Sequence, residues 1–293
     1  MTEQSKILVT GATGHVGGQV VSQLLGMGAS VRALVRNPDA AGLPGGVEVV
    51  RGDLSVPDTL DACLEGVESV FLVWPFMTAE AAPAALEAIT RHARHLVYLS
   101  SMGVRDDRAQ QADTINAFHA DLERLIKQTG LEWTFLRPSG FATNTLMWAE
   151  QIRADGVVRW PFGAASRSLI HERDIAAVAA RALTEDGHAG ATYLLTGPQS
   201  LTQVEQVDAI GEAIGRPLRF EEISPDAARQ DLFTGMPSSV ADGALNAWAG
   251  FVTEPELVTS TVHEVTGASA HTFRDWASDH ADDFRRSSAE EVR

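Results

Sequence analysis

The chain has 293 residues, of which 44% are hydrophobic, and its formal net charge at pH 7 is −16. This length and composition suit one large domain, or a large and a smaller one, around a substantial core. The negative charge argues against a nucleic-acid partner, because such surfaces concentrate positive charge. No apolar run reaches the length of a membrane span.

The cysteine and lysine content predicts the compartment and the source. Cys63 is the only cysteine, which excludes an internal disulfide and fits a reducing cytoplasm. The first expected strand begins at Lys6, which leaves no room for a signal peptide. Lys6 and Lys127 are the only lysines among 23 Lys and Arg residues, a bias typical of a GC-rich bacterial genome. We therefore expect a cytoplasmic bacterial protein.

Apolar, β-rich segments alternate with helical patterns in the first half of the chain. The expected strands cover residues 6–10, 30–35, 47–51, 70–74, 96–100 and 133–137. The expected helices cover residues 16–27, 58–64, 79–92 and 114–129. This alternation predicts an α/β fold with a doubly wound parallel Rossmann sheet, which binds ligands beyond the carboxyl ends of its strands.

The second half of the chain has a different pattern. We expect strands at 157–162, 168–170 and 191–195, a helix at 174–183 capped by Asp174, and an amphipathic helix at 202–214. Beyond Gly215 we expect helices and loops with breaks at Pro225, 235–237 and Gly250. Residues 1–155 should form the Rossmann domain, with 168–196 returning to it. Residues 156–293 should form a smaller mixed α/β, mainly helical cap that binds substrate.

Three glycines lie where the first strand leads into a helix. Gly11, Gly14 and Gly17 have the spacing G-x-x-G-x-x-G, which suits a tight turn, a close approach of backbone to a pyrophosphate, and close helix packing. Thr13, His15 and Val16 stand between them and are expected to contact the same phosphates, at the helix N-terminus. The motif predicts a dinucleotide site, although a glycine loop without a nucleotide is the alternative.

Two later strand ends bear on the identity of the nucleotide. Arg36 follows the second strand, where arginine accommodates the 2′-phosphate of NADP and an acid selects NAD. Asp53 and Leu54 follow the third strand, where the carboxylate is expected to bind the adenine amine. The alternatives are a solvated arginine at position 36 and a helix cap at Asp53. Arg32 is a weaker candidate for the phosphate.

These motifs resemble the short-chain dehydrogenase/reductase superfamily, and in particular its atypical NmrA-like group, which includes quinone oxidoreductase and triphenylmethane reductase types. The resemblance covers nearly the whole chain. It rests on residues 11–17, 35–37, 52–54, 100–103, 136–138, 173–176 and 193–198, and on Phe141 with Asn144. It implies an NAD(P)H-dependent oxidoreductase with NADP(H) as cofactor.

The usual acid of the superfamily is absent. Carbonyl-reducing members carry Tyr-x-x-x-Lys on the helix after strand 5, but both tyrosines here, Tyr98 and Tyr193, lack a lysine four residues later. Alignment on Glu123 puts His119 in the position of the family lysine and Ile115 in that of the tyrosine.

His119 is the tentative catalytic residue. An unperturbed imidazole exchanges protons near neutral pH, and the resemblance implies a contact with the nucleotide ribose or the substrate. The alternative is a packed helix histidine. Ser100 and Ser101 resemble the serine site of the superfamily, so Ser100 is a cofactor candidate and Ser101 a second tentative catalytic residue. The alternative is that the two serines simply cap the loop after the strand.

Without an acid, hydride transfer requires a substrate that accepts electrons readily, which favours quinones, activated enones or conjugated dyes. Flat molecules of this kind would stack on aromatic residues at strand exits. The expected substrate contacts, besides His119, are Trp74, Met102, Phe141, Asn144, Trp148 and Phe162. Trp74, Pro138 and Phe141 are also expected beside the cofactor. The alternative for the aromatic residues is that about half of them belong to the core.

The sequence therefore predicts an NADPH-dependent reductase of an aromatic or quinone-like small molecule, in a tailoring step of bacterial secondary metabolism. The alternative is a non-catalytic NADP(H) redox sensor of the NmrA type, which would need a protein partner. A monomer or a homodimer is expected in either case. No metal-ligand spacing and no Gly-x-Ser-x-Gly elbow occurs, which argues against a metalloenzyme and a serine hydrolase.

Overall fold

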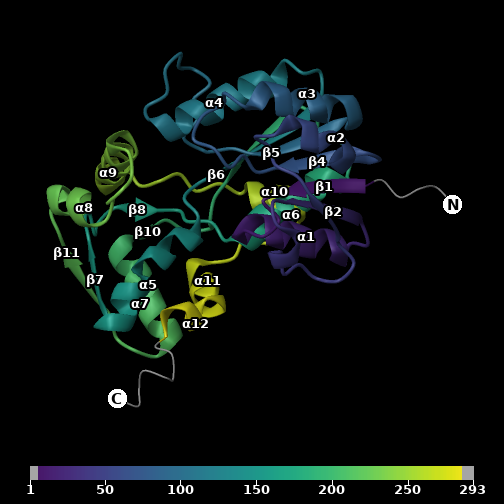
Figure 1. Ribbon diagram of the computed structural model, residues 1–293. Coiled ribbons are helices and arrows are strands. Elements are labelled where there is room, and N and C mark those ends of the chain that lie inside the picture. Colours follow the sequence, from purple (N-terminus) through teal and green to yellow (C-terminus); the bar gives the residue numbers. More distant parts are fainter. Residues whose placement is uncertain (1–5, 286–293) are drawn as a thin grey trace. The chain divides into compact units, whose positions relative to one another are not determined.

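The computed structural model describes residues 6–285, which form two compact units (Figure 1). The first unit contains residues 6–138 together with Glu172–Leu195 and Thr261–Ala268. The second contains Ser139–His171, Thr196–Ser260 and residues 269–285. No helix in the described part of the chain has the length and apolar character needed to cross a membrane.

Seven parallel strands form the central sheet of the first unit, in the order β3-β2-β1-β4-β5-β6-β9. They are β1 (Lys6–Thr10), β2 (Ser30–Val35), β3 (Glu48–Arg51), β4 (Val67–Leu72), β5 (His95–Leu99), β6 (Glu132–Pro138) and β9 (Ala191–Leu195). The order reverses between β1 and β4, which makes this the switch point at which such sheets bind ligands. The predicted doubly wound parallel sheet is confirmed.

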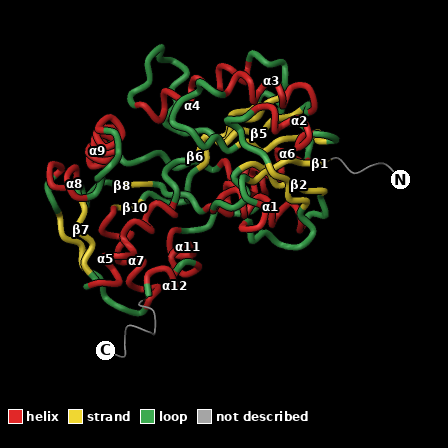
Figure 2. Tube along the Cα trace, viewed as in Figure 1, coloured by secondary structure: helices red, strands yellow, loops and turns green. Residues whose placement is uncertain are grey.

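Helices cover both faces of this sheet (Figures 1 and 2). One layer contains α1 (His15–Gly26), α6 (Glu172–Thr184) and α10 (Thr261–Thr266), and α6 packs against the other two. The other layer contains α2 (Leu60–Leu64), α3 (Ala82–His92) and α4 (Thr114–Lys127), in which α3 lies between its neighbours. Short 3-10 turns occur at Pro38–Ala40 and Pro57–Thr59. Because both faces are covered, the central strands are largely apolar, with Arg32 in β2 and Arg137 in β6 as buried exceptions.

The second unit contains two small sheets surrounded by helices. Strand β7 (Val157–Trp160) pairs in parallel with β11 (Arg219–Glu222), and β8 (Ser166–Arg167) pairs antiparallel with β10 (Leu201–Thr202). The helical segments are η3 (Ala142–Trp148), α5 (Ala149–Ala154), α7 (Gln203–Ile214), α8 (Pro225–Asp231), α9 (Ser238–Thr253), α11 (Phe273–Asp279) and α12 (Ala281–Phe284). Trp148, Trp160 and Trp276 are prominent in its apolar core.

The boundaries of the two units differ from the expected ones. The first unit ends at Pro138 and not at residue 155, because η3 and α5 pack into the apolar core of the second unit. Residues 172–195 return to the first unit, close to the expected 168–196. Helix α10 also returns to the first unit and packs against α6, a long-range contact that no local sequence pattern predicts.

Several local features differ from the expected ones. Asp174 does not cap a helix, because α6 already begins at Glu172 and Asp174 is buried in its first turn. Gly250 does not break a helix, since it lies inside α9. Strand β11 was not expected, because Arg219–Glu222 has the sequence RFEE, whose single apolar residue shows no alternation.

The turn after β1 is held in place by a side chain and by glycine geometry. The Thr10 hydroxyl donates to the Val73 carbonyl oxygen at 3.1 Å and accepts from the Val73 N–H at 2.7 Å, which joins the ends of β1 and β4. Gly11 then adopts a φ of +64°, in the left-handed region that favours glycine. At Gly17 a Cβ would lie 2.1 Å from the Gly11 carbonyl oxygen, so α1 packs there only because the side chain is absent.

We expect Gly17→Ala to lower the free energy of unfolding by about 2 kcal/mol, because the new Cβ overlaps backbone that cannot move freely. The matched control is Gly18→Ala, whose Cβ would lie an ordinary 3.4 Å from the Ala12 carbonyl oxygen. The control should gain up to about 1 kcal/mol from helix propensity. Chemical denaturation of both variants measures the contrast, and equal stabilities would contradict the assigned close approach.

Candidate functional site

The glycine loop at the switch point has the geometry of a dinucleotide cradle. Gly14 is the N-cap residue of α1, and no side chain caps the helix there. The Gly14 N–H donates to the Gly11 carbonyl oxygen at 3.0 Å. A Cβ at Gly14 would meet only that oxygen, at 3.4 Å, so packing within the protein does not require glycine here. A bare backbone at a helix N-terminus is the arrangement that lets a pyrophosphate approach closely.

The residues between the glycines contribute in different ways. Thr13 and His15 are exposed beside the loop. Val16 is buried, so its side chain belongs to the core and only its backbone borders the loop. The site therefore offers mostly main-chain groups, as expected for recognition of a pyrophosphate.

Arg36 and Asp53 follow neighbouring strands, and their side chains interact. Arg36 is exposed, while the Asp53 carboxylate accepts hydrogen bonds from the Ser55 N–H at 2.8 Å and the Ser55 hydroxyl at 2.7 Å. These bonds, helped by the positive charge of Arg36, hold the pKa of Asp53 below its usual range. Asp53 thus closes a local turn and is not a helix cap, because the following 3-10 turn begins at Pro57.

Two neighbouring residues belong to the interior. Arg32 is buried and donates to the carbonyl oxygens of Cys63 and Glu65 and to the Glu48 carboxylate, so it is not available to a cofactor phosphate. Leu54 is 6% exposed and packs in the main core of the first unit. Both side chains stabilise the fold around Arg36.

The serines after β5 are both engaged with helix α4. The buried Ser100 hydroxyl donates to Glu123 Oε1 at 2.6 Å. The Ser101 hydroxyl donates to Asn116 Oδ1 at 2.8 Å and accepts from the Gly103 N–H at 3.2 Å. Their hydroxyl protons are already used within the protein, so a substrate oxygen would have to compete with these bonds.

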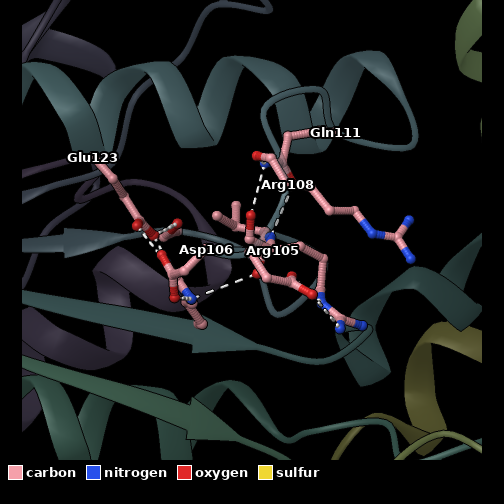
Figure 3. Close-up of polar contacts among 9 residues, drawn as sticks. Arg105, Asp106, Arg108, Gln111 and Glu123 are labelled. Carbon is pink, nitrogen blue, oxygen red and sulfur yellow. Dashed lines mark hydrogen bonds and ion pairs between the residues drawn. The ribbon is translucent and has the colours of Figure 1, made fainter.

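A buried guanidinium connects the same region to the end of β6. Arg137, 4% exposed, donates from Nε to Glu123 Oε1 at 2.9 Å and from Nη2 to Glu123 Oε2 at 2.6 Å. It also donates twice to Asp106, each time at 2.7 Å. Figure 3 shows Glu123 and Asp106 facing one another across this contact, beside the turn that Gln111 closes with Arg105. The loop after β5 is therefore tied to β6 and α4.

His119 projects from α4 onto Tyr98 of β5. Its Nδ1 lies 2.6 Å from the Tyr98 hydroxyl, and its ring packs on Phe118 at a centroid distance of 4.1 Å. Burial lowers the pKa of His119 to about 4. Burial, with the Glu123 charge, raises the pKa of Tyr98 well above its usual range. Both groups are therefore uncharged near pH 7. The sequence predicts that His119 exchanges protons near neutral pH, as an unperturbed imidazole does, whereas the buried ring stays neutral there.

The other expected contacts in the first unit lie at strand exits. Trp74 is 7% exposed and its indole N–H donates to the Thr78 carbonyl oxygen at 2.8 Å, which makes it largely a core residue. Met102 is partly exposed, and its N–H donates to the Pro138 carbonyl oxygen at 3.0 Å. The exits of β5 and β6 thus lie side by side.

The second unit holds the remaining candidates. Phe141 and Phe162 are partly exposed, and Asn144 is exposed. Trp148 is 2% exposed and packs edge-on against Trp160, so it belongs to the core and offers no surface for stacking. Phe162 has a φ of +59°, unusual for a residue with a side chain.

Sequence reasoning missed the ion pairs of Arg137 with Glu123 and Asp106, and the separate bond between Ser101 and Asn116. A charged residue at the end of an otherwise apolar buried strand was the available signal, because such a charge needs a partner. Residues 6–285 contain no group of three or more His, Cys, Asp or Glu side chains suited to a metal ion.

Comparisons with known proteins identify the family of the chain. The profile of the NAD(P)H-binding family matches residues 11–186. The (4-alkanoyl-5-oxo-2,5-dihydrofuran-3-yl)methyl phosphate reductase of Streptomyces griseus is 42% identical, covering 95% of this chain and 99% of its own. The NAD(P)H azoreductase of Xenophilus azovorans is 37% identical, with coverages of 95% and 99%.

The triphenylmethane reductase of Citrobacter sp., solved with NADP(H), superimposes with a TM-score of 0.78 at 22% identity, covering 94% of this chain and 99% of its own. The chain belongs to the NAD(P)H-binding family, and the predicted resemblance to the NmrA-like group is confirmed. It is an NAD(P)H-dependent oxidoreductase.

We expect Arg36→Ala to weaken NADPH binding by about 2 kcal/mol, roughly 30-fold, because charge-assisted bonds to the 2′-phosphate are lost. NADH lacks that phosphate and should lose little affinity. Fluorescence titration with both nucleotides measures the change. Arg124→Ala, which removes an exposed arginine paired with Asp121 on α4, is the matched control. An unchanged NADPH to NADH ratio in Arg36→Ala would show that Arg36 is merely solvated.

The low pKa of His119 predicts a loss of stability in acid. The unfolded chain takes up a proton at its ordinary pKa of 6.5, whereas the folded protein does so only near 4. The free energy of unfolding therefore falls as the pH drops from about 6.5 towards 4. Between pH 7 and pH 5, wild type should lose about 2 kcal/mol more than His119→Gln, in which no imidazole titrates. Equal losses in urea denaturation would contradict the shift.

Proposed function

We propose that the protein is an NADPH-dependent reductase of a conjugated carbonyl compound, either quinone-like or an activated alkene. The observation that carries the proposal is that the side chains beside β5 include no strong proton donor. The Tyr-x-x-x-Lys pair is absent, and the imidazole in its place is neutral with its Nδ1 held by Tyr98. The intact glycine loop and exposed Arg36 supply the nucleotide part of the proposal.

A conjugated acceptor suits a site with no strong acid. NADPH, when bound, supplies a hydride. A simple ketone then needs a proton donor at the carbonyl oxygen, because negative charge concentrates there. In a quinone or an activated alkene the charge spreads over a conjugated system, and protonation follows from water. The site then needs only to orient the acceptor and supply neutral donors, such as the His119 N–H that remains when Nδ1 accepts from Tyr98.

The relatives support this class of substrate. The substrate in the name of the Streptomyces griseus reductase has a ring double bond conjugated to two carbonyl groups, and the other curated relative is named for azo compounds. Each offers a conjugated acceptor for hydride. We extend this to the present chain, including a tailoring step in bacterial secondary metabolism. Reductase names at 42% and 37% identity weigh against the non-catalytic redox sensor.

Matched acceptors test the proposal. Cyclohexenone, an acyl butenolide and a naphthoquinone should oxidise NADPH with a kcat/KM at least about 100-fold above that of cyclohexanone, because only the saturated ketone needs the missing acid. Loss of NADPH absorbance measures the rates, and product analysis identifies the reduced bond. Equal turnover of cyclohexanone would contradict the absence of an acid. Tight NADPH binding without turnover of any acceptor would favour the sensor.

A further inference from the structure

A cavity of about 430 Å³ opens at the amino edge of the main sheet, opposite to the carboxyl edge that carries the glycine loop. Its walls come from the beginnings of β1, β4, β5 and β6, from the turn between α1 and β2, and from the loop between α6 and β9. All of these elements belong to the first unit. The volume lies within the usual range of small-molecule sites, which is about 300 to 1,000 Å³.

Two buried polar side chains line this cavity. Ser69 of β4 is 6% exposed and His95 of β5 is 9% exposed, and the two residues are paired neighbours in the parallel sheet. Neither the Ser69 hydroxyl nor His95 Nδ1 has a hydrogen-bond partner among residues 6–285. Neither atom is among the fully enclosed side-chain atoms that lack a partner there, so both face open space. Polar groups this deeply buried need a partner, and the cavity is where that partner would lie.

The hydrogen bonds around His95 determine what its free nitrogen can do. His95 Nε2 lies 3.2 Å from Thr134 Oγ1, and the Thr134 hydroxyl donates its proton to the His188 carbonyl oxygen at 2.7 Å. Thr134 Oγ1 can therefore only accept from His95, which places the imidazole proton on Nε2. Burial lowers the pKa of His95, so the ring is neutral near pH 7. His95 Nδ1 thus presents a lone pair to the cavity and accepts a hydrogen bond.

The rim of the cavity is acidic. Its charged side chains are those of Glu68, Arg94, Glu132, Glu185 and Asp186. Arg94 pairs with both Glu68 and Glu132. Glu185 pairs with an arginine one turn earlier in α6. Asp186 is exposed and has no hydrogen-bond or ion-pair partner among residues 6–285, so its negative charge at the mouth of the cavity is uncompensated.

We propose that this cavity is a second ligand site of the protein and that it binds a small organic amine as its ammonium ion. An ammonium group carries N–H donors and no acceptor. The cavity offers it the lone pair of His95, the hydroxyl oxygen of Ser69 and the carboxylate of Asp186. A metal ion does not fit, because the described residues include no group of three or more side chains that could hold one. Since such sheets bind nucleotides at their carboxyl edge, the amine is distinct from the hydride acceptor.

Calorimetry of the full-length protein with putrescine, a linear diamine, tests the site. Wild type should bind putrescine with a dissociation constant below about 1 mM, at least about 10-fold more tightly than the neutral diol of the same chain length. His95→Phe and Ser69→Ala each remove an acceptor and should weaken binding about 10-fold. Asp186→Asn removes only an exposed charge and should weaken it about 3-fold. The matched control is Asp121→Asn, an exposed aspartate of α4 outside the cavity, which should leave the affinity unchanged.

Three outcomes would overturn the inference. Equal affinity for the diamine and the diol, or equal weakening in Asp121→Asn, would show only a general attraction of cations to an acidic protein. Unchanged affinity in both Ser69→Ala and Asp186→Asn would exclude the cavity, even where His95→Phe fails to fold. Saturation with NADP should leave putrescine binding intact, so competition between the two ligands would place the diamine in the nucleotide site instead. Because none of these measurements involves turnover, the proposed reductase function stands or falls separately.

Discussion

The buried ion pair between Arg137 and Glu123 determines the geometry of the carboxyl edge of the main sheet. One guanidinium bonds both oxygens of Glu123 on α4 and both oxygens of Asp106 on the loop after β5, while Arg137 itself lies next to the last residue of β6. Removing one partner of such a buried pair typically costs about 3 to 5 kcal/mol, because the other charge is left uncompensated. The same Glu123 accepts from Ser100, so the pair also orients the start of the loop.

This network engages the polar groups beside β5, so the proposed function leaves the chemistry to the cofactor and the substrate. The hydroxyls of Ser100 and Ser101 are committed to Glu123 and Asn116, and the imidazole of His119 is neutral against Tyr98. In relatives with the usual pair, a lysine beside a tyrosine provides an acid. Here burial removes charge from the equivalent helix position, because the desolvation of the His119 ring outweighs the attraction of the Asp113 charge. Under the proposed function, this arrangement suits acceptors that delocalise the incoming charge.

Arg36 and Arg167 differ in how firmly the surrounding residues hold their side chains. Arg36 is exposed beside Asp53 and is held by few contacts, as suits a residue that adapts to a cofactor phosphate. Arg167 is fixed by Glu256, Phe251 and the bare backbone of Gly140.

Local pattern was sufficient for the alternation of strands and helices and for the glycine loop, because hydrophobic period and φ preference are properties of short segments. It also located Arg36 and Asp53, which follow directly from strand ends. The sequence did not predict strand β11, because RFEE carries no alternation, or the return of α10 to the first unit, because α10 packs through distant contacts.

Tertiary structure alone decided which candidate side chains are available. Trp148 is enclosed by Trp160, Ser100 is bound by Glu123, and the pKa of His119 falls because the ring is buried against Tyr98 and Phe118. Burial and charge pairing arise between residues far apart in the chain, and Arg167 with Glu256, 89 residues apart, is the clearest case.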